Sequence, residues 1–344
     1  MDSKRSTLLT GLVALALILF STILADAALT VTPDGAALGF SLSQFATGFG
    51  QSDSACCGPL GIAVVPGTGN VIVDNVGNNT NYVFADVDGR NAGLSGGAAN
   101  FISSTPFVAF PPAMAATGGA VYTSGGFSGP NANHLIKLNN DGSINTVFAL
   151  PGNGALISNG LWTNPVDGHL VGVGNGIWDI DVSGAIPTFR LITSTGSDGV
   201  TASPDGTTVY NTGVTGFSFA TGAITFPTLS PGCGGADGMG VISSSNALNG
   251  RIVVNCNDGQ VSLINPVTRT SVIIATGGTR GDYAAPDPSN GTLFLTQTND
   301  VFRLSCGEGC GIGVVSPVPE PSTLLLLSGG LVAFGVMIRR AKRR

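Results

Sequence analysis

The chain has 344 residues, which suits one large all-β domain. Only 10% of the residues are charged, against about 25% in a typical soluble domain, and alternating apolar residues are abundant, which excludes a coiled coil and a disordered polyelectrolyte. Residues 28–315 hold 17 acidic and seven basic side chains, and this net charge of −10 excludes nucleic acid as an expected partner.

The N-terminus is typical of a secretory signal peptide. Lys4 and Arg5 precede an apolar run over residues 8–24, and Ala25–Ala27 follow it as a small-x-small cleavage pattern. We expect residues 1–27 to be the signal peptide of an exported protein. An uncleaved anchor helix is the alternative, because the apolar run is long.

The body consists of short apolar segments with a period of two, separated by Gly, Asn, Asp and Pro, a pattern typical of many short strands. A residue pair, most often ending in Gly, opens such a segment at six places. The spacings run from 39 to 52 residues, and the pairs are Leu60-Gly61, Pro112-Ala113, Asn159-Gly160, Asp198-Gly199, Asp237-Gly238 and Asp282-Tyr283. This is the blade length of a β-propeller with four strands per blade. We expect an all-β, six-bladed propeller over residues 28–315, with seven blades as the alternative because residues 93–110 could contain further strands.

The sixth unit has room for only three strands, at residues 283–285, 292–296 and 300–305. Residues 38–43 alternate as a strand does and precede the first unit. We expect them to supply the missing strand, because this closes the ring and removes an exposed sheet edge.

Six cysteines in an exported chain predict disulfides. In the propeller, Cys233 precedes the fifth inner strand and Cys256 ends the second strand of the same blade, so we expect these two to pair. The remaining expectations are a local Cys306–Cys310 bond and a vicinal pair formed by Cys56 and Cys57. A metal–thiolate site is the alternative.

The C-terminus has three parts in order: Pro319-Glu320-Pro321, an apolar run over residues 324–338, and a basic end. This order closely resembles the PEP-CTERM sorting signal of Gram-negative bacteria. The resemblance implies that a membrane exosortase cuts near the Pro-Glu-Pro and sends the protein to the outer surface. We expect residues 316–344 to be the sorting signal, with a transmembrane segment over 323–338 that anchors the protein before processing. A plain single-pass anchor is the alternative.

The first residue of four successive pairs would face the mouth of the central channel, namely Asn159, Asp198, Asp237 and Asp282. Converging carboxylates repel one another unless a cation lies between them. Oxygen ligands favour Ca²⁺ or Mg²⁺, so these four residues are the predicted metal site. The alternative is that Asp before Gly only makes a turn where the strand begins.

Two families resemble parts of the body. Residues 61–79 resemble an NHL-type repeat, and residues 198–210 and 237–239 resemble gluconolactonase and regucalcin propellers. The second resemblance implies Asn and Asp ligands to a divalent metal at the axis, best matched by Asn159 and Asp237. The axial Glu of that family has no equivalent in this sequence.

We expect a surface-sorted binding or structural module of the outer envelope or exopolysaccharide layer, with exopolysaccharide or envelope proteins as partners, rather than an enzyme. The loops at residues 75–81 and 124–133 should surround the mouth, and both are polar and uncharged. A metal-dependent hydrolase or lyase, such as a lactonase, is the alternative. The lack of a convincing His or Glu general base weighs against that alternative.

Overall fold

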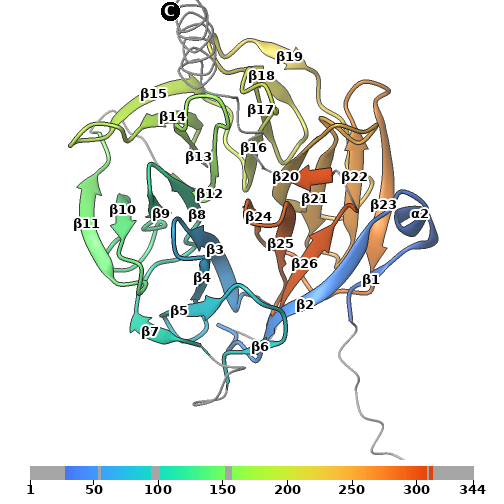
Figure 1. Ribbon diagram of the computed structural model, residues 1–344. Coiled ribbons are helices and arrows are strands. Elements are labelled where there is room, and N and C mark those ends of the chain that lie inside the picture. Colours follow the sequence, from blue (N-terminus) through green and yellow to red (C-terminus); the bar gives the residue numbers. More distant parts are fainter. Residues whose placement is uncertain (1–27, 53–55, 94–100, 152–156, 308–309, 313–344) are drawn as a thin grey trace, which may run out of the picture.

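The computed structural model describes residues 28–52, 56–93, 101–151, 157–307 and 310–312. Six β-sheets stand around a central axis (Figure 1), which confirms the six-bladed propeller. The expected signal peptide, sorting motif and transmembrane segment lie outside these residues. Within them, no helix is long and apolar enough to cross a membrane.

Each blade contains four antiparallel strands, which are given below in order from the axis outwards. Blade 1 consists of β3 (Pro59–Val65), β4 (Asn70–Asn75), β5 (Thr80–Ala85) and β7 (Ser103–Pro106). Blade 2 consists of β8 (Met114–Thr117), β9 (Ala120–Ser124), β10 (His134–Leu138) and β11 (Ile144–Ala149). Blade 3 consists of β12 (Ile157–Thr163), β13 (Leu170–Gly174), β14 (Ile177–Asp181) and β15 (Thr188–Thr193).

Blade 4 consists of β16 (Val200–Ala202), β17 (Thr208–Asn211), β18 (Gly216–Ser218) and β19 (Ile224–Phe226). Blade 5 consists of β20 (Ala236–Ser244), β21 (Ile252–Cys256), β22 (Val261–Asn265) and β23 (Thr270–Thr276), flanked by β1 (Thr30–Val31) and β27 (Cys310–Ile312). Blade 6 consists of β24 (Ala284–Asp287), β25 (Thr292–Thr296), β26 (Val301–Ser305) and β2 (Ser41–Thr47), with β6 (Arg90–Asn91) beside β2. The region that allowed a seventh blade contributes β7, the outer strand of blade 1.

The ring closes as predicted, because β2 from the N-terminal segment pairs with β26 of blade 6 from Ser41↔Ser305 onwards. The closing strand begins at Ser41 rather than at residue 38. Helix α2 (Pro33–Ala37) occupies the preceding residues and is capped by Leu38. Gly39 then turns the chain with a φ of 89°, a conformation that favours glycine.

Arg303 on β26 holds this closure together. Its guanidinium donates to Asp86 Oδ1 at 2.5 Å, to Asp88 Oδ1 at 2.9 Å, and to Asp287. The same group lies over the rings of Phe45 and Phe294, 5.1 and 4.6 Å from their centroids. Asp86 and Asp88 directly follow β5, the third strand of blade 1, so one buried cation joins blade 6, the N-terminal strand and blade 1.

All three expected disulfides are present: Cys56–Cys57, Cys233–Cys256 and Cys306–Cys310. Each cysteine is therefore oxidised, and the metal–thiolate alternative is wrong for this structure. The last of these bonds ties the end of blade 6 to β27, which pairs with the end of β20.

Apolar side chains fill the spaces between neighbouring blades; for example, Ile72 and Val83 of blade 1 pack with Ile136 of blade 2. Asp74 lies on the same side of β4 as Ile72, because side chains two residues apart share a face of a strand. It is buried, and neither of its carboxylate oxygens has a hydrogen-bond partner. Burial raises the pKa of Asp74 well above its usual range.

Candidate functional site

The inner strands of the blades begin around a cavity of about 390 Å³, which we call the mouth cavity. All four residues of the predicted metal site line it: Asn159, Asp198, Asp237 and Asp282. The sequence therefore placed these side chains correctly at one end of the channel. We call this end of the propeller the mouth face, and the opposite end, where the inner strands finish, the lower face.

β-Bulges place two of these side chains. The register between β12 and β13 shifts between Ile157 and Gly160, and Asn159 lies within that shift. A shift between Ala236 and Met239 of β20 contains Asp237 in the same way. A bulge re-aims the side chains at the end of a strand. Asn159 and Asp237 thus lie inside strands, and not in the turn that the alternative interpretation expected.

The glycines of the repeated pairs allow the inner strands to approach one another. A Cβ atom on Gly199 would overlap the carbonyl oxygen of Asp237, and one on Gly238 would overlap the backbone of Tyr283. A Cβ atom on Gly160 would lie 3.0 Å from the Cα atom of Gly199. These glycines are therefore required by close packing around the axis, which brings the mouth residues together.

Hydrogen bonds connect the polar residues of the mouth cavity in pairs. Asn159 Nδ2 donates to Asp198 Oδ1 at 2.8 Å, and Arg280 Nε donates to Asp282 Oδ1 at 2.7 Å. The amide of Asn257, oriented with its nitrogen towards the acceptors, donates to Asp237 Oδ2 at 3.2 Å. The second oxygen of Asp282 has no partner, although this residue is only 4% exposed.

The surroundings of the cavity disfavour the charged forms of two of its own aspartates, Asp237 and Asp282. Burial raises the pKa of Asp282 to about 6, and the Arg280 guanidinium opposes this shift. Burial also raises the pKa of Asp237 well above its usual range, and the charges of Asp282 and Asp198 add to the increase. A group that binds here with a positive charge would relieve this repulsion.

Tyr283 forms the floor of the mouth cavity. Its ring extends from blade 6 across the axis, and its hydroxyl oxygen lies 2.6 Å from the carbonyl oxygens of Met114 in blade 2 and Leu161 in blade 3. Asn255 supports it by donating to the Tyr283 carbonyl at 3.1 Å. Below this ring the channel continues as a second cavity of about 240 Å³, lined mostly by apolar residues of all six inner strands.

The mouth residues supply suitable donors for a divalent cation but not a finished cage. Oxygen atoms and a net negative charge suit Ca²⁺ or Mg²⁺. Among the described residues, however, the groups of three whose ligand atoms lie within 4.8 Å of one another are Cys56–Cys57–Asp282 and Cys233–Cys256–Asp258, and not the three axial aspartates. Arg280 already provides a cation beside Asp282. In this structure the carboxylates of Asp198, Asp237 and Asp282 are therefore not gathered around one point, and we derive no chemical step through a bound ion.

Sequence reasoning missed two features of the mouth. Arg280 lies two residues before Asp282, and a lone basic residue beside an axial acid was the available signal. Phe110 and Phe127 also line the cavity, with ring centroids 5.7 Å apart and planes at 89°. Phe127 belongs to the 124–133 loop, which was predicted to present a polar surface.

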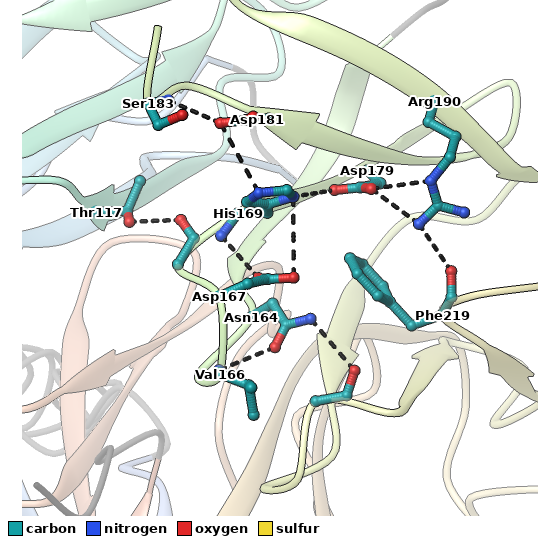
Figure 2. A network of polar contacts seen from close by, with 12 residues as sticks. Thr117, Asn164, Val166, Asp167, His169, Asp179, Asp181, Ser183, Arg190 and Phe219 are labelled. Carbon is teal, nitrogen blue, oxygen red and sulfur yellow. Dashed lines mark hydrogen bonds and ion pairs between the residues drawn. The ribbon is translucent and has the colours of Figure 1, made fainter. Parts of the chain in front are cut away.

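A second polar cluster lies in blade 3, away from the mouth (Figure 2). His169 Nδ1 lies 2.8 Å from Asp179 Oδ1, and Arg190 Nη2 donates to Asp179 Oδ2 at 2.8 Å. Arg190 also donates to the carbonyl of Phe219 in the next blade at 2.9 Å. These contacts connect blade 3 to blade 4, so we assign the cluster a structural role.

Comparison with known proteins supports the predicted sorting signal and the predicted propeller separately. Residues 317–343 match the PEP-CTERM protein-sorting motif. The chain thus carries a sorting tail that implies export, membrane anchoring through the C-terminal segment and processing by an exosortase-type enzyme. No curated protein is significantly similar in sequence.

Solved structures share the propeller fold. An auxiliary nutrient-binding protein from Bacteroides thetaiotaomicron matches with a TM-score of 0.54 and 8% identity, over 77% of this chain and 76% of that one. A gluconolactonase from Xanthomonas campestris matches with a TM-score of 0.52 and 14% identity, over 80% and 94%. A streptogramin B lyase matches with a TM-score of 0.50 and 13% identity, over 77% and 97%. Identities this low establish the fold alone, and one fold hosts many functions.

Proposed function

We propose that this protein is a binding module displayed at the outer surface of a Gram-negative bacterium, in the envelope or exopolysaccharide layer, and that the mouth cavity is its binding site. The observation that carries the proposal is the mouth cavity itself, which contains a buried carboxylate with an unpartnered oxygen. Concave sites with a few convergent polar groups are the usual places for ligands.

The position of the C-terminal end of the propeller supports a mouth that faces away from the membrane. Ile312, the last described residue before the sorting motif, pairs with Ile242 of β20 and receives support from the Gly291 carbonyl, which accepts its N–H at 3.0 Å. These contacts lie at the lower face. A protein attached through the segment that follows would turn its mouth away from the membrane, towards external ligands.

Retention in the envelope of the processed protein, from which the C-terminal anchor has been removed at the sorting motif, tests the proposal. Phe127→Ala and Asp282→Asn should be exported normally but released from the envelope fraction into the medium. Val267→Ala, an exposed residue in the β22–β23 turn, is the matched control and should be retained as the wild type is. Equal retention of all four proteins would show that the mouth is not the binding site.

A metal-dependent hydrolase or lyase is the second candidate, with the ion held by Asn159, Asp198, Asp237 and Asp282. The free oxygen of Asp282 and the raised pKa of Asp237 favour it. The test is the melting temperature in EDTA against excess Ca²⁺ or Mg²⁺. A site filled at about 100 times its Kd would stabilise by about 2.7 kcal/mol, a shift of several degrees. This shift should vanish in the Asp198→Asn/Asp237→Asn double variant. Its absence in the wild type would exclude a resident ion.

A further inference from the structure

The mouth cavity has two chemically different walls. Blades 1 and 2 contribute the apolar wall: the Cys56–Cys57 disulfide, Leu60, Pro112, Phe110 and Phe127. Blades 3 to 6 contribute the polar wall: Asn159, Asp198, Asp237, Arg280 and Asp282. A ligand that fills the cavity therefore meets an apolar surface on one side and carboxylates on the other.

The apolar wall is a built feature. The Phe127 N–H donates to the Phe110 carbonyl at 2.9 Å, which fixes the two loops against each other. Gly126 has a φ of 66°, and a Cβ atom there would overlap the Phe110 backbone, so the contact requires glycine. Phe127 nevertheless remains 53% exposed. An aromatic ring held in place but uncovered is favourable to cover with an apolar group.

The polar wall has more acidic than basic side chains. Three carboxylates face one guanidinium, and Arg280 is the single basic residue among the described residues that line the cavity. It satisfies one oxygen of Asp282 and leaves the other without a donor in a site that is 4% exposed. A buried carboxylate oxygen without a partner is costly, so the cavity favours a positively charged hydrogen-bond donor.

We infer that the mouth cavity binds an organic ammonium ion with an apolar body, the body covering Phe127 and Phe110 while the N–H groups donate to Asp282 and Asp237. This ligand class uses both walls. A bare metal ion would leave the aromatic wall uncovered, a neutral molecule would leave the carboxylates uncompensated, and an anion would add to their repulsion. A cation near an aromatic face gains further attraction from the ring. The inference rests on the proposal that the mouth is the binding site.

Calorimetric titration of the purified full-length protein in EDTA tests the inference. The probes are phenethylammonium, its neutral isostere 2-phenylethanol, and ethylammonium, which lacks the apolar body. Phenethylammonium should bind at least tenfold more tightly than either control. Equal binding of 2-phenylethanol would overturn the charge requirement, and equal binding of ethylammonium would overturn the apolar requirement.

Variants locate the binding site. One of them is expected to bind phenethylammonium more tightly, which a loss of folding could not cause. Phe127→Ala and Asp282→Asn should each weaken phenethylammonium binding at least fivefold, while Val267→Ala leaves it unchanged. Arg280→Met removes the competing cation and should tighten binding, and weaker binding in this variant would contradict the inference. If phenethylammonium fails to bind although Phe127→Ala abolishes envelope retention, the inference fails and the proposed function stands. If it binds but mouth variants are retained normally, the proposed function fails.

Discussion

Replacing Arg303 by Met should loosen the closure of the ring. The Arg303 side chain is 8% exposed and forms ion pairs with three aspartates, of which Asp287 is fully buried. Removing one partner of a buried ion pair costs about 3–5 kcal/mol, because it leaves an uncompensated charge. The two ring contacts add about 1 kcal/mol each where the guanidinium is desolvated, and the Met side chain restores part of the packing. We expect a loss of about 4 kcal/mol.

For a domain of this size, each 1 kcal/mol corresponds to about 2–4 °C in Tm, so calorimetry should show a decrease of about 10 °C. Arg269→Met is the matched control, because Arg269 is exposed and lies over a single ring, 5.6 Å from the centroid of Phe226. Its effect should stay within about 0.5 kcal/mol. Adding Asp287→Asn to Arg303→Met removes the buried charge and should recover part of the loss. Equal Tm values for the two arginine variants would refute this account of the closure.

Three further predictions concern stability. Asp74→Asn should stabilise the protein at pH 7.5 and have little effect near pH 4, because the wild type loses stability as pH rises through the raised pKa of Asp74; melts across pH that run parallel would contradict this. Removing the Cys233–Cys256 bond, which spans a separation of 23 residues, should cost about 3 kcal/mol by the chain-entropy relation, and an unchanged urea midpoint would argue against it. Burial opposes a charged His169, but the hydrogen bond to Asp179 and nearby carboxylates raise its pKa overall. The stabilisation that charged His169 gives the fold is therefore lost as pH rises through that pKa. His169→Gln should lower the free energy of unfolding more at pH 5.5 than at pH 8.5, and the reverse order would contradict the His169–Asp179 ion pair.

Much of the fold could be predicted because the same pattern of residue pairs and short apolar segments repeats along the sequence. The glycine after Asn159, Asp198 and Asp237 recurs because each inner strand must approach its neighbour closely at the axis. The three-strand sixth unit required a strand from elsewhere, and the N-terminal segment had the right alternation. The domain boundaries at residues 28 and 315 stay predictions, since the flanking segments lie outside the described residues.

The candidate site was predictable only in part. The carboxylates follow from strand positions, which repeat. Arg280 and Phe127 belong to loops, where the direction of a side chain depends on local turns such as the one at Gly126, and no repeat reports it. The Arg303 cluster joins residues more than 200 positions apart, so no local pattern could reveal it. The metal site at the four axial residues stays a prediction.

The most direct test of the mouth as the binding site uses a fluorescent reporter within it. The native Trp162 and Trp178 are buried in the core, so their emission should stay constant during binding. Phe127→Trp places an indole in the exposed aromatic wall while preserving its apolar character. Titration of this variant with exopolysaccharide and envelope extract from the producing cells should give a saturable blue shift, and prior saturation with phenethylammonium should prevent any further shift. Co-sedimentation of the variant with the extract without any change in emission would contradict the account.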